Sequence, residues 1–422
     1  MVLDYIQWKQ DMRETRKFHI VTTTEGCATN LLENATYREH LHASGLVNCK
    51  NAEEAEVIIV NTCGYTTERE NYTQTVIQNL KDKFPNKEII VGGCLPKINA
   101  EKLSTVYQGP TFSPGDLNGL NSILNLKKDE NIDSSANFFD EQDFDDLSNT
   151  HQLALKVRPF YFQVEKLFKH KFQPLHNVLE TTIVNNEYFS IVVSQGCLGK
   201  CTFCAIKAAK GSVKSRPIDV IISEFKKGLS LGHKKFWLVG DDIGCYGYDI
   251  GLDFADLLEK ILALPDDFEL VINYFEPMWF VKLFDRMEKL LTDRRILNIN
   301  FPIQSGSYRI VRRMGREYDP AIVMDRIARI KKANPDLVIK TNIIVGFPGE
   351  RFKDYLDSLK TIKGFDAILP LKYTPRPGTG AMKYRDPVSE PIQEMRVKVM
   401  KAIVFFRHAW VALKSLLNPT RL

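Results

Sequence analysis

The stretch "SQGCLGKCTFC", residues 194–204, places three cysteines within eight positions. The C-x3-C-x2-C spacing of Cys197, Cys201 and Cys204 suits neither a structural zinc site, which takes four ligands, nor a disulfide framework. The chain has 422 residues and only 8 cysteines, and its first residues lack the long apolar core of a signal peptide. We therefore expect free thiols in a reducing cytoplasm, where clustered thiolates most often hold a metal.

The missing fourth thiol indicates what kind of metal site this is. Iron–sulfur clusters are usually held by four thiolates, so three leave one iron of a [4Fe–4S] cube open to a small molecule. The spacing, with the aromatic Phe203 just before the last cysteine, resembles the radical S-adenosylmethionine (SAM) enzymes. The resemblance implies that the open iron binds the amino and carboxylate groups of SAM, whose cleavage releases a 5′-deoxyadenosyl radical. A chance grouping of three cysteines on a loop is the alternative.

The first hundred residues alternate apolar runs with amphipathic segments, a pattern that predicts βαβ units and a parallel sheet. The apolar runs are residues 18–23, 56–63 and 88–94. Cys63 and Cys94 are the last residues of the second and third runs, and Cys27 follows the first, so each lies just past the end of one predicted strand. Because ligands of open α/β folds bind at the carboxyl edge of the sheet, we expect these thiols to form a second site with an open iron. The alternative is three small buried side chains.

Six further strand-like runs, separated by helical patterns, lie between residues 188 and 375. They predict a partial TIM-type barrel with its chemistry at the carboxyl ends of the strands. No run approaches 18 uninterrupted apolar residues, so we expect no transmembrane segment. The predicted fold is α/β: an open parallel-sheet α/β domain at 16–125, a connecting segment at 126–185, a partial (β/α)6 barrel at 186–390 and a C-terminal helical extension at 391–422.

Together the motifs resemble the methylthiotransferase family of radical SAM enzymes, from about residue 18 to about residue 385. The matching pieces are "GCATN", "VNTCGY", "VGGCLPK", "SQGCLGKCTFC", "KGSVKSRP", "LVGDDIGCYG", "PIQSGS", "RRMGREY", "NIIVGFPGE" and "YTPRPGTGA". The resemblance implies two [4Fe–4S] clusters and two uses of SAM: one molecule donates a methyl group to sulfur, and the other yields the radical that activates a substrate C–H bond. It also implies an electron donor such as a flavodoxin or ferredoxin.

The resemblance also assigns contacts to SAM. Asp242, in "GDD", matches the family segment that meets the SAM amino group, whereas Asp241 departs from the usual glutamine. Family analogy points Gln304 and Ser305, just after a strand, and the motif aromatic Phe203 toward SAM as well. Arg376 also lies at a strand end and either holds a carboxylate or forms a surface ion pair.

Other residues receive less specific interpretations. We interpret Glu276, in "FEPMW", as a solvated loop carboxylate, with a position near the substrate as the alternative. Cys49 is expected to be packed, and Cys245 to be packed or else to serve as an extra ligand or reactive thiol. Residues 126–150 carry 8 acidic residues against 2 lysines and are expected to be solvated or mobile, whereas residues 156–172 are basic and aromatic. That second segment predicts an amphipathic cover for the barrel or a clamp on a peptide or nucleic acid.

The substrate is the least determined part. Family members that act on tRNA or a ribosomal protein end in a small β-barrel, whereas about 35 residues follow the last barrel motif here and predict one or two helices. These helices would pack on the barrel, contact a second copy or lie at a membrane surface, in that order. With a mild net charge of +5, we expect a peptide or protein substrate, including a ribosomally made peptide. A tRNA adenosine is the less favoured alternative, and an iron–sulfur protein that only carries electrons is the third.

Overall fold

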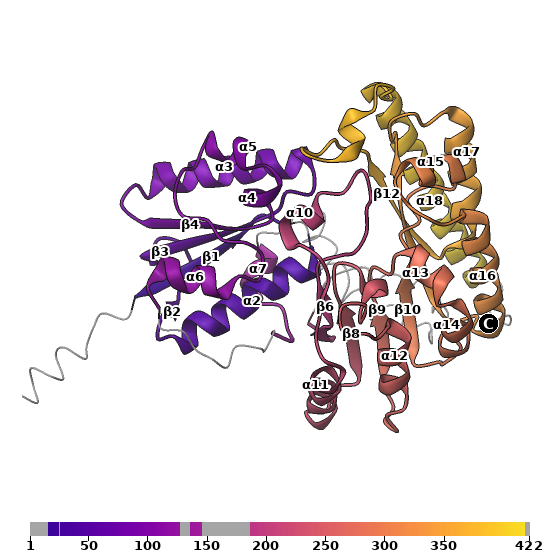
Figure 1. Ribbon diagram of the computed structural model, residues 1–422, viewed down its shortest axis with the longest axis horizontal. Helices are drawn as coiled ribbons and strands as arrows, with labels where there is room; N and C mark the ends of the chain where they lie inside the picture. The colour runs from indigo at the N-terminus through magenta and orange to yellow at the C-terminus, as the bar shows by residue number, and fades with distance from the viewer. Residues whose placement is uncertain (1–15, 25, 127–135, 146–185, 418–422) are drawn as a thin grey trace, which may run out of the picture. The chain divides into compact units, whose positions relative to one another are not determined.

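The computed structural model describes residues 16–24, 26–126, 136–145 and 186–417. The chain divides into two compact units (Figure 1). The first contains the described residues before Leu153 together with Ala208–Lys210, and the second contains the remaining described residues. The basic and aromatic segment at 156–172 lies outside the described residues, as does most of the predicted connection at 126–185.

The first unit is built on a four-stranded parallel sheet in the order β2-β1-β3-β4. Its strands are β1 (Lys17–Thr22), β2 (Val47–Asn48), β3 (Val57–Thr62) and β4 (Glu88–Gly93). Its helices are α2 (Ala28–Ala43), α3 (Thr67–Lys83), α4 (Leu95–Ile98), α5 (Ala100–Ser104), α6 (Leu117–Leu124) and α7 (Gln142–Asp145). The three predicted strands are confirmed, and the two-residue β2 was not predicted because it is too short to show a periodicity.

The sheet is covered on both faces, as a parallel sheet requires. Val57 and Ile59 of β3 pack with α2 and α6, while the alternating Ile58 and Val60 pack with α3 and α5. Cys49 lies in the second of these cores and is packed, as predicted.

The acidic stretch departs from its prediction in the part that is described. Asp143 of α7 is fully buried, and both of its carboxylate oxygens accept hydrogen bonds from Arg38 of α2 at 2.8 Å. A buried carboxylate is tolerated when it is paired in this way. The expectation of a solvated segment is therefore wrong at Asp143.

The second unit contains a six-stranded parallel sheet in the order β12-β11-β10-β9-β8-β5. The strands are β5 (Phe189–Val192), β8 (Lys235–Val239), β9 (Glu269–Ile272), β10 (Ile296–Asn300), β11 (Val338–Val345) and β12 (Ala367–Lys372). All six match predicted runs. The first and last strands are not paired with each other, so the barrel is open, and the prediction of a partial (β/α)6 barrel is confirmed.

Helices follow the strands of this unit and lie on its outer side. Short strands and 3-10 turns lie near the strand ends. The helices are α10 (Ile206–Lys210), α11 (Ile218–Ser230), α12 (Phe254–Leu262), α13 (Pro277–Lys282), α14 (Phe284–Leu290), α15 (Tyr308–Arg313), α16 (Pro320–Ala333) and α17 (Phe352–Thr361). The short elements are the antiparallel pair β6 (Ser194–Gln195) and β7 (Lys214–Ser215), and the 3-10 turns η1 (Ile243–Cys245), η2 (Ile362–Gly364) and η3 (Gly380–Lys383).

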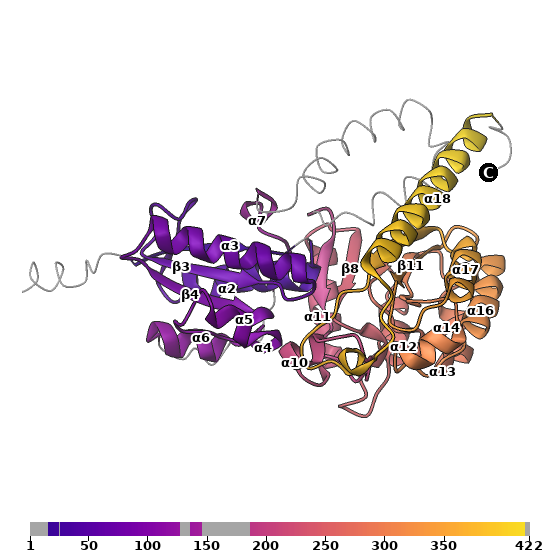
Figure 2. The same ribbon diagram turned by 90° about the horizontal axis from the view of Figure 1, so that it is seen from above.

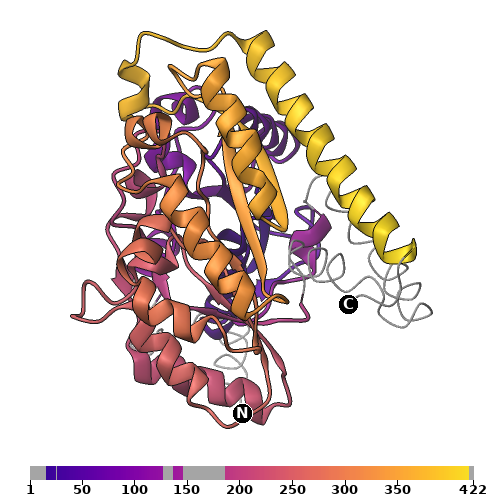
Figure 3. The ribbon, with the colours of Figure 1, turned by 90° about the vertical axis from the view of Figure 1, so that its right-hand side faces the viewer.

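The C-terminal segment forms one long helix, α18 (Glu390–Leu417), visible in Figures 2 and 3. Val397, Met400 and Val404 are buried on the face of the helix that lies against β11 and β12. A second face leaves large apolar side chains exposed at a helical spacing: Ile392, Met395, Val399, Ile403 and Phe406. No helix in the described part of the chain is long and apolar enough to cross a bilayer.

Candidate active site

The cysteine-rich loop of the second unit begins at Gly196, directly after β6. Gly196 has a φ of 81°, and a Cβ there would lie 2.3 Å from the carbonyl oxygen of Ser212, so the position requires glycine. The backbone N–H of Gly196 donates to Asp241 Oδ2 at 2.8 Å. Asp241 follows the neighbouring strand β8, so it fixes the loop at the residue before Cys197. Its predicted contact with SAM stays a prediction.

Backbone amides and burial set the chemistry of the three thiols. The N–H of Gly199 donates to Cys197 Sγ at 3.1 Å, and the N–H of Ile206 donates to Cys204 Sγ at 3.4 Å. Burial raises the pKa of the Cys204 thiol to about 12, and it also raises the pKa of Cys201. Buried thiolates need a compensating positive charge, which a metal cluster supplies.

The spacing of the thiols separates a cluster from a single metal ion. Among the described residues, the one group of at least three metal-binding side chains whose donor atoms all lie within 4.8 Å of one another is Cys197, Asp242 and Cys245. The three motif thiols are therefore more widely spread. One tetrahedral zinc ion would draw its sulfur ligands to about 3.8 Å from each other, from a Zn–S bond of about 2.3 Å. Three spread thiols fit a multi-iron cube better than one ion.

Asp242 occupies the centre of the polar contacts beside Cys197 and is only 4% exposed. Its carboxylate accepts hydrogen bonds at 3.1 Å from the N–H groups of Gly244 and Glu276 and from Trp279 Nε1. Cys197 Sγ lies 3.6 Å from its Oδ2. These contacts join the ends of β8 and β9 to the cysteine loop. The predicted role of Asp242 toward the SAM amino group stays a prediction.

Glu276 is not the solvated carboxylate that its loop position suggested. It is 8% exposed, and its Oε1 lies 3.2 Å from the guanidinium of the buried Arg316. Burial raises the pKa of Glu276 to about 7. Arg316 also donates to the carbonyl of Pro302 at 2.7 Å and lies over the ring of Phe203. Its motif, "RRMGREY", contains three arginines, and no local pattern indicates which of them is buried.

A cavity of about 190 Å³ opens beside these residues. Its lining combines the cysteine loop with charged and aromatic side chains: Leu198, Gly199, Lys200, Cys201, Glu276, Met278, Trp279, Lys282, Gly315, Arg316 and Glu317. A ligand in this cavity would meet both the Cys201 thiol and the buried ion pair.

Two residues at strand ends have strained backbones. Gln304, after β10, has a φ of 61°, and Tyr274, after β9, has a φ of 47°. Such conformations in non-glycine residues cluster at functional sites. The Oε1 atom of Gln304 is buried, and no described residue donates to it. A bound molecule with an N–H or O–H group would fit this acceptor.

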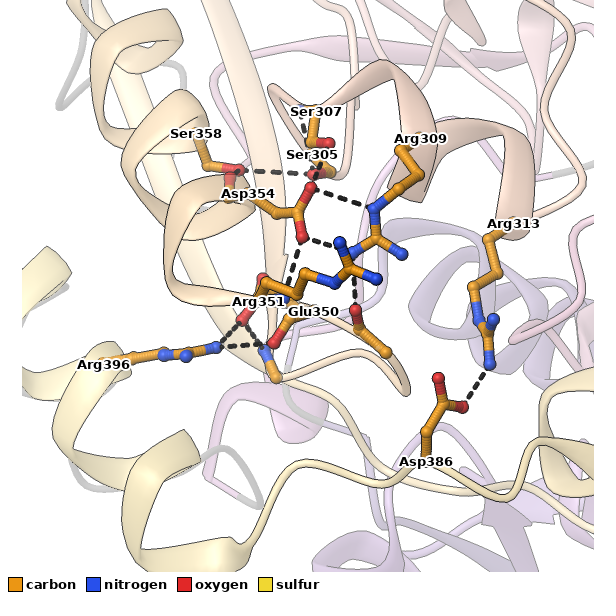
Figure 4. A network of polar contacts seen from close by, with 12 residues as sticks. Ser305, Ser307, Arg309, Arg313, Glu350, Arg351, Asp354, Ser358, Asp386 and Arg396 are labelled. Carbon is orange, nitrogen blue, oxygen red and sulfur yellow. Dashed lines mark hydrogen bonds and ion pairs between the residues drawn. The ribbon is translucent and has the colours of Figure 1, made fainter.

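The remaining residues predicted to contact SAM differ in their surroundings. The Ser305 hydroxyl lies 3.3 Å from that of Ser358 on α17, within the polar network around Asp354 in Figure 4. Arg376 is only 4% exposed and donates through Nε to the carbonyl of Pro375. Phe203 packs edge-on against Phe347, with ring centroids 6.5 Å apart. Their roles toward SAM stay predictions.

The first unit places Cys27, Cys63 and Cys94 after the ends of the neighbouring strands β1, β3 and β4. Cys63 follows β3 directly, and the N–H of Cys94 donates to the carbonyl of Thr62 at 2.9 Å. Burial raises the pKa of Cys63 to about 11, with a further increase from the nearby Cys27. Cys27 is also the N-cap residue of α2.

Comparisons with known proteins match both units. The model of the Radical SAM superfamily matches residues 191–362, and that of the uncharacterized protein family UPF0004 matches residues 17–111. A probable threonylcarbamoyladenosine tRNA methylthiotransferase of Pyrococcus abyssi is 29% identical over 85% of this chain and 78% of its own. The ribosomal protein uS12 methylthiotransferase of Carboxydothermus hydrogenoformans is 27% identical over 90% and 80%.

One further relative and one solved structure are similar to this chain. A tRNA-2-methylthio-N(6)-dimethylallyladenosine synthase of Bdellovibrio bacteriovorus is 28% identical over 96% of this chain and 84% of its own. The structure of TsrM, a radical S-adenosylmethionine methyltransferase from Kitasatospora setae, matches the fold with a TM-score of 0.54 at 11% identity, over 87% of this chain and 75% of that one. Both matched models and the named relatives support a radical SAM methylthiotransferase, an enzyme class that uses SAM and two [4Fe–4S] clusters.

Proposed function

We propose that this enzyme converts an unactivated C–H bond of its substrate into C–SCH3, with one cluster bound in each unit. Cys197, Cys201 and Cys204 would hold the cluster that binds SAM, and the auxiliary cluster would be held by Cys27, Cys63 and Cys94. The observation that carries the proposal is the placement of both groups of three thiols at the carboxyl ends of parallel strands. Each group leaves one iron without a protein ligand.

When bound, the cluster and SAM supply the radical chemistry, and the protein positions the reactants and excludes water. Asp241 and Gly196 hold the start of the cysteine loop, and the N–H groups of Gly199 and Ile206 stabilise charge on sulfur. Met278 and Trp279 give the cavity apolar walls, which protect a reactive carbon radical from side reactions.

Three groups of the second unit are suited to hold SAM itself. The buried Oε1 of Gln304, to which no described residue donates, suits an N–H or hydroxyl donor, and the carboxylate of Asp242 suits the amino group. Arg376 offers a buried guanidinium for a carboxylate. Electrons would come from a small donor such as a flavodoxin or ferredoxin, in the reducing environment of the cytoplasm.

For the substrate, we propose an adenosine of tRNA as the first candidate. Two of the relatives described above are named as tRNA-modifying enzymes, and one is named as an enzyme that modifies a ribosomal protein. This reverses the order of preference drawn from the sequence. A peptide or protein side chain remains the second candidate, because the exposed apolar face of α18 lies beside the exposed Lys398 and Lys401. Such a face suits an amphipathic, acidic peptide.

Turnover assays test both the proposed reaction and the proposed substrate. Anaerobically reconstituted enzyme would receive SAM, a reductant and either bulk tRNA or a candidate protein or peptide, followed by mass analysis for 5′-deoxyadenosine and for a methylthio gain. Modified tRNA would support the first candidate, and a gain on the peptide alone would replace it with the second. Protein that holds both clusters but produces no 5′-deoxyadenosine would contradict the proposed reaction.

A further inference from the structure

A second thiol lies next to the cluster ligand Cys197. Cys245, in the turn η1 after β8, has its Sγ within 4.8 Å of the Cys197 Sγ and of an Asp242 oxygen. The proximity follows from the fold, because β5 and β8 are neighbouring parallel strands whose ends carry the two cysteines. The backbone bond from Val193 N–H to the Val239 carbonyl, 2.9 Å long, extends this pairing toward both residues.

The turn that carries Cys245 is tightly packed. Cys245 is fully buried, and its thiol donates to the backbone carbonyl of Asp242 at 3.1 Å. A Cβ added to the preceding Gly244 would lie 2.6 Å from the ring of Trp279. The sulfur of Cys245 is therefore held beside Cys197 by the backbone around it.

These three side chains do not make a good separate metal site. The Asp242 carboxylate already accepts three hydrogen bonds, from Gly244, Glu276 and Trp279, and a metal ion would have to compete with all of them. Without a metal ion, the neighbouring thiols of Cys197 and Cys245 are left to react with each other. A disulfide needs an S–S distance of about 2.0 Å, so the two sulfur atoms have to approach by less than about 3 Å.

We propose that Cys197 and Cys245 form a reversible disulfide when the radical cluster is lost. The inference rests on the proposed role of Cys197 as a cluster ligand, since bound iron would keep its sulfur from reacting. With hydrogen peroxide as oxidant, the two thiols lose two electrons and two protons, an S–S bond forms, and the peroxide leaves as two water molecules. The bond would keep Cys197 from irreversible oxidation and would block cluster assembly until a dithiol reductant restores both thiols.

Mass mapping of the cluster-free protein tests the proposal. Full-length protein stripped of iron under anaerobic conditions would be treated with hydrogen peroxide, alkylated and digested without reductant. We expect a cross-linked pair of peptides that contains Cys197 and Cys245 and is lighter by two hydrogens. Reconstitution should then load about half of the iron, about four atoms instead of eight, and full loading should return after dithiothreitol.

Matched variants complete the test. In Cys245→Ala, and in the closer mimic Cys245→Ser, the same treatment should drive Cys197 to sulfinic or sulfonic acid, with no recovery after dithiothreitol. Cys49→Ala, at a packed thiol of the first unit, should behave like wild type. The proposal is overturned if wild-type Cys197 stays free or pairs with Cys201 or Cys204. It is equally overturned if the Cys245 variants recover their iron as wild type does. Wild-type protein that never loads eight irons before oxidation would instead contradict the proposed clusters.

Discussion

Asp241 Oδ2 accepts a hydrogen bond from the N–H of Gly196 at 2.8 Å, one residue before the first cysteine of the radical site. The contact joins the end of β8 to the loop after β6 and gives a role to a residue that departs from the family pattern. Loop placement and cluster retention should therefore depend on this side chain.

We expect Asp241→Ala to release iron from the second unit faster than wild type, because the Gly196 N–H loses its charged acceptor. A bond of this kind contributes about 1.5–3 kcal/mol, which corresponds to a roughly 10- to 150-fold change in retention. Iron loss to a chelator would be followed by absorbance. Asp241→Asn, which keeps an acceptor oxygen, should retain iron almost as well as wild type. Asp319→Ala is the control. It removes the carboxylate that accepts a 2.8 Å hydrogen bond from the backbone N–H of Ala321 at the start of α16, and it should not change the rate of iron loss.

Gly196→Ala should prevent normal loading of the radical cluster. The added Cβ would meet the Ser212 carbonyl oxygen at 2.3 Å, so the backbone must shift. Gly232→Ala is the matched control, since Gly232 also has a positive φ, of 88°, but has no atom within 4 Å of a built Cβ. That control should lose only about 1 kcal/mol of stability and should load iron normally. Equal iron content in both variants would show that the contact with Ser212 does not control cluster loading.

Glu276→Gln should change the pH dependence of stability. Burial raises the pKa of Glu276 from its usual 4.5 to about 7, so the folded protein retains a proton that the unfolded chain releases. The stability that this proton contributes is complete below pH 4.5 and is lost as the pH rises to 7. Between pH 4.5 and pH 8 we expect the stability of the variant relative to wild type to rise by about 3 kcal/mol. Urea unfolding of cluster-free protein at both pH values measures the free energy of unfolding. Glu317→Gln, at an exposed neighbouring glutamate, is the control. The same difference at both pH values would contradict it.

Arg316→Met should destabilise the protein by about 3–5 kcal/mol at pH 8, because it leaves the buried Glu276 carboxylate without its partner. At pH 6 the cost should be smaller, since the carboxyl can take up a proton. Combining Arg316→Met with Glu276→Gln should recover part of the loss at pH 8, as a double-mutant cycle would show. Simple additivity of the two changes would argue against the ion pair.

The strands and the cysteine groups were accessible from sequence because both are local patterns. Buried parallel strands appear as continuous apolar runs, and a cysteine just past such a run must lie at the carboxyl edge of the sheet. The burial of Glu276 was not accessible. It depends on Arg316, which is 40 residues further along the chain and is placed by the adjacent strand end. The same holds for Cys245, whose proximity to Cys197 follows from the pairing of β5 with β8.

The short edge strand β2 and the buried Asp143 illustrate two further limits. Two residues cannot show a period of two, so the pairing of Val47 with Lys17 of β1 gave no signal in the sequence. Asp143 lies in a strongly acidic stretch that composition assigns to solvent, yet Arg38 on α2 binds it. Composition describes a segment on average and does not identify the one residue that is anchored.

The central claim is that two separate groups of three cysteines hold two clusters. Iron analysis of anaerobically reconstituted protein tests it most directly, in wild type and in the variant with Cys27, Cys63 and Cys94 all changed to Ala. We predict roughly eight irons per chain in wild type and roughly four in the variant. The variant should still cleave SAM but should transfer no methylthio group. Retention of all eight irons by the variant would contradict the two-cluster account.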